Sequence, residues 1–322
     1  MSASPRSLTN QAPWQPLRRG GWMLIALALA GLALLPLVLT TYRLGVATEI
    51  LIFALLAISI DVLAGYAGRT PLGHGAIFGA STYVVIYWSS VLGGSVWTGL
   101  VIGVVASVLL SALFGLLATR VSGVYFLLLT LALGMIVWGV CLRWTSVTGG
   151  ENGIRGVGRP DALADPVTFY YAVLALVAAM TWLTWRFVRS PFGLTLRGIR
   201  DSESRMRSLG YNVPLHMFLA FTVSGFFAGV AGACYALFNN FVSPSTVQLT
   251  QSVEGLLMVI IGGVGTLFGA FIGAALMITL EYVVSAYTAR WPMVLGFMFI
   301  LTMIFAPQGI LGAVRQLFAR HP

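Results

Sequence analysis

The residues most able to do chemistry in this sequence are ionisable side chains set in apolar stretches. Asp61, His74, Glu254 and Glu281 lie in or near such stretches. In lipid these groups are costly and usually face a cavity or a partner group. We expect Asp61 to lie close enough to the membrane surface to reach it. His74 lies between two glycines, where it either lines a solute path or caps the end of a helix. Glu254 is expected at the start of a short helix, where the helix dipole stabilises an anion. No two carboxylates have the spacing of a proton relay.

The motifs of common enzyme classes are missing. A phosphate-binding P-loop needs a Lys, but the chain has no Lys and all its cations are Arg. There is also no Gly-x-Ser-x-Gly or His-Glu-x-x-His sequence, and Cys141 and Cys234 lack metal-binding spacing. We therefore expect a protein without catalytic residues, bound metal or cofactor of its own. The net charge of +9 is explained by membrane topology and by contact with anionic lipid headgroups. It does not indicate nucleic-acid binding.

The densest group of charges is the segment 186–215, with six arginines and a net charge of +4. Pro191 and Gly193 end the preceding helix, apolar residues then recur near helical spacing, and Gly210 provides a C-terminal stop. This pattern predicts a pair of short amphipathic helices at the membrane surface. Two roles stay open from the residues alone: an interfacial helix held by anionic lipid, or a docking helix for another protein.

The second long loop, 142–167, is electrically balanced, because three arginines face three acidic residues. Its centre is rich in turn-forming residues. Two interpretations stay open. The loop is a plain exposed turn, or it has a role as a gate over the path or as a contact for a partner. The candidate residues are Gly149, Gly150, Glu151, Asn152 and Gly153.

The elements that position these residues are membrane helices. The chain is 58% hydrophobic and only 8% charged, whereas a soluble domain carries about 25% charged residues. Its uncharged runs are continuous, which favours helices over barrel strands. We expect an all-α polytopic membrane protein of about ten transmembrane helices. They are placed near 22–40, 46–64, 74–90, 98–119, 123–141, 168–188, 216–239, 252–263, 267–287 and 291–307, with the eighth short enough to be broken or re-entrant.

Charge asymmetry predicts the orientation. The positive-inside rule places the 186–215 loop in the cytoplasm and the 142–167 loop outside. An even number of spans then places both termini in the cytoplasm. The expected organisation is a cytoplasmic N-terminal arm (1–21), one transmembrane domain (22–310) that contains both loops, and a cytoplasmic tail (311–322). No cleavage site follows the first apolar run, so we expect an uncleaved first helix.

Glycine patterns predict close helix packing and an internal echo. Gly225-x-x-x-Gly229 is a small-residue seam of the kind that joins membrane helices. Residues 73–80 also resemble residues 263–270. This echo is either shared packing chemistry or a trace of internal pseudo-symmetry, which transporters commonly have.

Four blocks together resemble one family. They are the Gly-His-Gly block at 72–80, the Gly-rich block at 148–154, the Arg-rich block at 192–210 and the Ser-x-Glu block at 252–266. Their order and spacing over roughly 45–310 are similar to those of permease subunits of branched-chain amino acid ABC importers, most of all the LivM type.

The resemblance implies a permease subunit in the bacterial inner membrane that moves branched-chain, hydrophobic amino acids by alternating access. The implied partners are a LivH-type permease, two cytoplasmic ATPases that hold ATP and Mg²⁺, a periplasmic substrate-binding protein and membrane lipid. The Arg-rich block would then be the ATPase-coupling loop, with Arg197, Ile199, Arg200, Asp201, Ser202, Glu203, Arg205, Leu209 and Gly210. The translocation path would include Gly73, His74, Gly75, Glu254, Gly262 and Gly263.

Three departures from the family pattern leave the substrate open. Asp61 stands where Asn is frequent, Arg69-Thr-Pro71 replaces a Leu-Ser lead-in, and Ala270 replaces a frequent Pro. The same scaffold could import urea, short amides, or aromatic or aliphatic acids. A self-sufficient secondary transporter or channel is the alternative of another class, and a membrane enzyme ranks last.

Overall fold

A computed structural model of the chain describes residues 19–288, 290–305 and 309–312. The expected N-terminal arm and C-terminal tail lie almost entirely outside the described residues. The described elements are mostly helices, with two very short strands. The main helices are α1 (Arg19–Val38), α2 (Thr41–Asp61), α3 (His74–Ser90), α4 (Val96–Ala118), α5 (Val124–Arg143), α7 (Pro166–Arg189), α8 (Pro191–Asp201), α9 (Glu203–Ser208), α10 (Val213–Asn239), α11 (Leu249–Gly262), α12 (Leu267–Ser285) and α13 (Trp291–Phe305).

The helix lengths establish a multi-pass membrane architecture. Among the described residues, six helices are long and apolar enough to cross a membrane: α2 with its continuation, α4, α5, α7, α10 and α12. A crossing needs about 20 apolar residues, and α3 has 17. Helix α11 has 14 residues. The all-α polytopic fold is therefore confirmed, while the count of ten spans and the orientation stay predictions.

Helices α2 and α10 form the centre of the bundle. In its most apolar window, α2 is 89% buried and α10 is 72% buried, whereas α4 and α5 are only 28% and 22% buried. The seam predicted on α10 is real: Gly225 and Gly229 face Ser111 and Ser107 of α4 without room for a Cβ. The Ser81 hydroxyl of α3 also donates to the Gly229 carbonyl at 2.8 Å. Small residues thus let α3, α4 and α10 approach closely.

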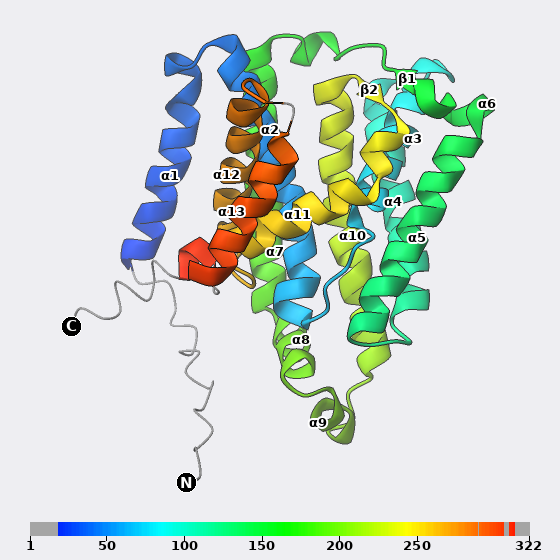
Figure 1. Ribbon diagram of the computed structural model, residues 1–322, viewed down its shortest axis with the longest axis vertical. Coiled ribbons are helices and arrows are strands. Elements are labelled where there is room, and N and C mark those ends of the chain that lie inside the picture. Colours follow the sequence, from blue (N-terminus) through cyan, green and yellow to red (C-terminus); the bar gives the residue numbers. More distant parts are fainter. Residues whose placement is uncertain (1–18, 289, 306–308, 313–322) are drawn as a thin grey trace.

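The two ends of the bundle carry different structures (Figure 1). Helices α8 and α9 protrude at one end, below α7 and α10. At the other end, strand β1 (Ile154–Arg155) pairs antiparallel with strand β2 (Phe241–Val242). The short elements α6 (Thr145–Thr148), η2 (Gly150–Asn152), η3 (Asp161–Leu163) and η4 (Pro244–Val247) accompany β1 and β2 in the chain. We call these the α8–α9 end and the β1–β2 end. The start of α1 and the end of α13 both lie away from the β1–β2 end.

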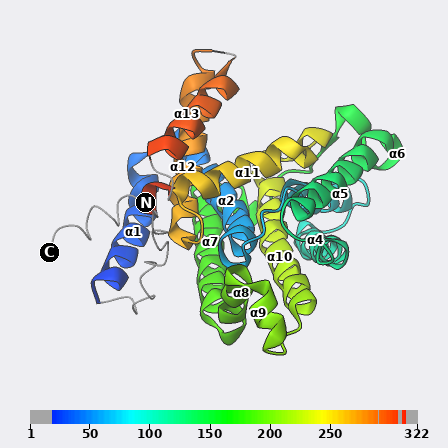
Figure 2. The same ribbon diagram turned by 60° about the horizontal axis from the view of Figure 1, so that its bottom comes forward.

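Two breaks interrupt the helices of the bundle. Helix α2 continues into a π-helical turn, η1 (Val62–Ala67), and ends at Gly68, whose φ is +70°. The chain then runs without helix to His74, where α3 begins. The second break is the turn at 263–266 between α11 and α12. Helix α11 crosses the bundle obliquely, as Figures 1 and 2 both show.

Candidate functional site

The Arg-rich segment forms the predicted pair of short helices, and each begins with its own side-chain cap. Ser190 accepts a hydrogen bond from the Gly193 N–H at the start of α8. Ser202, in extended conformation, accepts from the Arg205 N–H at the start of α9. The φ of Gly210, +86°, is the left-handed conformation expected after a helix end. The local sequence therefore folds as its capping signals indicate.

The two faces of α8 and α9 differ sharply in exposure. Leu196 and Ile199 are buried against the bundle. On the other side, Leu194 is 68% exposed and Leu209 is 66% exposed, and Arg205 beside them is also exposed. The Asp201 side chain is 66% exposed. This end thus presents apolar and cationic side chains together, a composition that suits a protein partner with an apolar groove and an acidic rim.

Glu203 ties α9 to the bundle instead of facing outward. Its carboxylate accepts from Arg69 at 3.0 Å and from Arg207 at 2.6 Å. Burial disfavours the charged form of Glu203, but the Arg207 hydrogen bond and the Arg69 charge outweigh it, so its pKa is lowered. Arg69 is only 7% exposed, and it also donates to the Val121 carbonyl at 2.6 Å. The α9 helix is therefore held by a charge pair that links it to the chain between α2 and α3.

Two arginines of α8 also donate hydrogen bonds to backbone carbonyls of neighbouring elements. Arg200 donates to the Gly65 carbonyl of η1 at 2.7 Å. Arg197 donates to the Val188 carbonyl at 3.0 Å, and its guanidinium lies 5.3 Å from the centre of the Tyr66 ring. Among the predicted coupling residues, Ile199 is buried, while Arg197, Arg200 and Glu203 bond to neighbouring elements and Ser202 caps α9. Asp201, Arg205, Leu209 and Gly210 are exposed, and so is Arg200 despite its bond to Gly65.

The predicted path residues around the first break are deeply packed. His74 is fully buried. Its Nε2 lies 2.6 Å from the Ser224 hydroxyl, which donates to the Ser59 carbonyl. Gly75 donates its N–H to the Ser252 hydroxyl of α11 at 2.8 Å, and a Cβ on Gly75 would collide with Ser252. In this conformation the Gly73–Gly75 block joins α3 to α10 and α11, and its role in a path stays a prediction.

Glu254 does not occupy the position that the sequence suggested. Helix α11 begins at Leu249, so its first turn holds no acidic residue, and Glu254 lies beyond the reach of the helix N-terminus. It interacts electrostatically with Glu49 of α2 and Glu281 of α12. The Tyr282 hydroxyl donates to Glu49 at 2.7 Å. Glu254, Glu49 and Glu281 thus lie near enough to interact, although they are distant in sequence. The expectation that no carboxylate pair serves as a proton relay stays a prediction.

The second break also departs from expectation at Asp61. Its side chain is 1% exposed, so it does not reach an interface. One carboxylate oxygen accepts from the Gly265 N–H at 2.6 Å. Gly262 and Gly263 lie in the same region, where Gly262 packs on the Gly269 backbone and Gly263 has a φ of +119° that favours glycine. Asp61 thus holds the turn at 263–266 against the end of α2.

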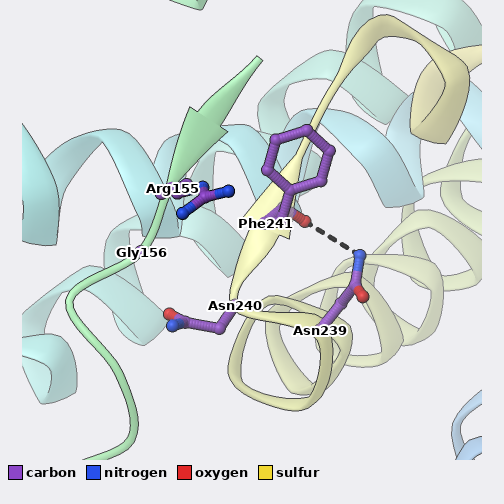
Figure 3. A pocket seen from close by; sticks show the side chains of 5 residues that line it. All are labelled: Arg155, Gly156, Asn239, Asn240 and Phe241. Carbon is purple, nitrogen blue, oxygen red and sulfur yellow. Dashed lines mark hydrogen bonds between the residues drawn. The ribbon is translucent and has the colours of Figure 1, made fainter. Parts of the chain in front are cut away.

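The glycine-rich loop at the β1–β2 end is held mainly by its backbone. Gly149, Gly150 and Gly153 all have positive φ, while Glu151 and Asn152 are exposed. The chain then enters β1, and Gly156 donates to the Asn240 carbonyl at 2.9 Å. Beside it lies an open hollow of about 590 Å³ lined by Arg155, Gly156, Asn239, Asn240 and Phe241 (Figure 3).

Asn240 fixes the conformation of the chain around this hollow. It adopts the left-handed conformation with φ of +52° at the end of α10. Its side-chain oxygen accepts from the Gly158 N–H at 3.0 Å. Arg159 donates to the Leu237 carbonyl, and burial lowers the pKa of its guanidinium. The loop is thus tied to the end of α10 at three successive points.

The architecture is that of a multi-pass membrane protein, and comparison with known families gives its class. The family described as "Branched-chain amino acid transport system / permease component" matches residues 42–306. The chain therefore belongs to this family of ABC importer permeases. LivM, the high-affinity branched-chain amino acid transport permease of Salmonella typhimurium, is 28% identical over 87% of this chain and 72% of its own length.

Two further relatives widen the comparison. LivH of Escherichia coli, also a branched-chain amino acid transport permease, is 25% identical over 81% of this chain and 91% of its own length. LsrC of Klebsiella pneumoniae, an autoinducer 2 import permease, is 29% identical over 57% of this chain and 54% of its own length. The resemblance drawn from the four sequence blocks is confirmed.

The sequence missed Glu49, Arg69 and Asn240 as contributors to these sites. Arg69 and Glu203 are 134 residues apart, and no local pattern pairs them. Asn240 carried a detectable signal, because Asn is one of the few residues that readily adopt a positive φ. Nothing in the sequence around Glu49 indicates its neighbours.

Proposed function

We propose that this chain is the LivM-type permease subunit of an ATP-driven importer for branched-chain amino acids. It would pair with a LivH-type permease, receive substrate from a periplasmic binding protein, and couple to two cytoplasmic ATPases. The observation that carries the proposal is the family match joined to the α8–α9 end, where anchored helices expose Leu194 and Leu209 beside Arg205. The chain supplies the path, and ATP hydrolysis belongs to the partners.

The topology that fits this role has ten spans, with the α8–α9 end and both termini in the cytoplasm. The +4 charge of the 186–215 loop supports this orientation. So does the position of α1 and α13, which begin and end away from the β1–β2 end. Alternating access would open the path, including the breaks at Gly73–Gly75 and Gly262–Gly263, to one side at a time.

A second candidate substrate class follows from the likeness to LsrC, whose printed role is autoinducer 2 import. The same scaffold would then carry a polar solute that is not an amino acid. Uptake of radiolabelled leucine by the full complex, with valine, isoleucine and unrelated solutes as competitors, separates the two. If valine and isoleucine reduce leucine uptake and the unrelated solutes do not, the result supports the importer of branched-chain amino acids.

The docking surface is tested by placing a carboxylate in it. In the complex purified from membranes, Leu209→Asp should reduce the copurifying ATPase about tenfold, because burying an unpaired charge removes at least about 1.4 kcal/mol of binding. Val157→Asp is the matched control, since Val157 is 61% exposed at the β1–β2 end. A parent protein that purifies without any ATPase, and transports with an ion gradient alone, would refute the proposal.

A further inference from the structure

The end of α2 lies between helix α8 and the turn that joins α11 to α12. We call residues 61–68 the η1 segment, because they comprise Asp61, the π-helical turn and Gly68. On one side this segment packs against α8, and on the other it contacts the turn between α11 and α12. π-helical turns inside helices are rare and frequently mark functional sites.

In the contact with α8, an arginine side chain bonds to a backbone carbonyl at the end of the η1 segment. Near the end of η1, the carbonyl of Gly65 lacks its helical partner, since a helix leaves its last carbonyls unsatisfied. The Arg200 guanidinium donates to this carbonyl at 2.7 Å, and a cation is favourable there. A Cβ on Gly68 would collide with the Arg200 side chain. Arg200 therefore docks into a site that the end of the η1 segment creates.

The contact with the α11–α12 turn is equally close. Asp61 accepts from the Gly265 N–H at 2.6 Å in a fully enclosed position. A Cβ on Gly65 would collide with both Asp61 and the Gly265 backbone, so the two backbones touch directly. Arg200 also attracts Asp61 electrostatically. One guanidinium, one carboxylate and two glycines thus connect α8 to the turn.

Helix α11 links the turn, which follows its last residue, with the first turn of α3, which contacts its beginning. Helix α11 ends at this turn, and its Ser252 accepts from the Gly75 N–H at 2.8 Å. A close-packed interior transmits displacement because it has no voids to absorb it. We infer that the η1 segment carries movement of α8 to the α11–α12 turn, with Arg200 and Asp61 as its positioning residues. This inference rests on the proposed function, in which an ATPase moves α8.

The test measures movement at the turn itself. Val264 is 47% exposed, and both native cysteines are buried. A Val264→Cys substitution therefore provides an accessible thiol for a water-soluble maleimide. In the full complex in nanodiscs, ATP with vanadate should change the labelling rate about fivefold or more, the lower range of coupling between sites. Uptake per ATP hydrolysed is measured in parallel in proteoliposomes.

Variants in this background separate transmission from mere stability. Arg200→Met and Asp61→Leu should each abolish the ATP-dependent change in labelling while ATPase remains bound, and uptake per ATP should fall about fivefold or more. Asp61→Asn keeps an acceptor for Gly265 and should restore the change. The double variant Asp61→Leu with Arg200→Met should be no worse than the worse single variant, because both act in one route. Arg120→Met, an exposed arginine outside this route, is the control and should respond like the parent.

Two results would overturn the inference. One is a normal labelling change and normal uptake per ATP in assembled Arg200→Met. The other is loss of the response in assembled Asp61→Asn. If Arg200→Met or Asp61→Leu fails to assemble, Asp61→Asn decides alone. A parent complex without ATP-driven uptake would instead refute the proposed function, so the two failures are distinguishable.

Discussion

The two ends of this bundle are held in place by different kinds of contact. At the α8–α9 end, charged side chains make the ties, as in the Arg69–Glu203–Arg207 group and the Arg200 bond to Gly65. At the β1–β2 end, strand pairing and positive-φ glycines hold the chain, and uncharged Asn240 and the cation Arg159 add side-chain bonds to backbone groups. Side-chain ties can be exchanged for contacts with a partner, whereas backbone ties fix one geometry. From this difference we expect the α8–α9 end to be the movable end and the β1–β2 end to be the rigid end.

The largest expected effect is at the rigid end. Gly153 has φ +66° and ψ −169°, a conformation almost confined to glycine. A Cβ there would also collide with the Val242 carbonyl. Gly153→Ala should destabilise the fold by about 3 kcal/mol or more, since backbone strain of about 1–3 kcal/mol adds to the collision. The readout is the thermal unfolding midpoint in detergent.

A matched control for this variant is Gly158→Ala. Gly158 lies in the same loop with φ +96° but has open space around it. The alanine variant is therefore destabilised by backbone strain without a collision. Equal unfolding midpoints for the two variants would contradict the view that the β1–β2 end is fixed by close backbone contact.

An intermediate effect is expected for the tie between Arg69 and α9. Arg69→Ala removes hydrogen bonds to Glu203 and Val121, and bonds to charged groups are worth about 1.5–3 kcal/mol each when partly buried. We expect faster amide hydrogen exchange in α9 with little change elsewhere. Arg120→Ala removes a neighbouring but exposed charge and should leave α9 unchanged. Loosening at the β1–β2 end as well would show that the two ends are not independent.

The smallest effect concerns pH. Because the pKa of Glu203 is lowered in the folded protein from its ordinary value of 4.5, its tie is fully present above about pH 4.5 and is lost as pH falls through the lowered value. Proteolysis of α9 should therefore not change between about pH 5 and pH 8. Glu203→Gln should be susceptible at all of these pH values. Loosening of α9 between pH 5 and pH 7 in the parent would contradict this assignment.

Local signals predicted one part of this structure and failed at another for a physical reason. The α8–α9 pair follows from Pro191, Gly193 and Gly210, because helix ends are encoded within a few residues. The burial of Asp61 and the grouping of Glu49 with Glu254 depend on how α2 packs against α11 and α12. Contacts between helices that are distant in sequence leave no pattern within either helix. The family resemblance identified the permease family, but not these contacts.

The separate caps of α8, α9 and α10 have a mechanical consequence. Ser190, Ser202 and Asn212 each satisfy the first backbone donors of the helix that they precede. We therefore expect each helix to be able to tilt about its own start without unwinding its neighbour. A force on α9 would then change the angles between α8, α9 and α10 and leave the length of each helix unaltered.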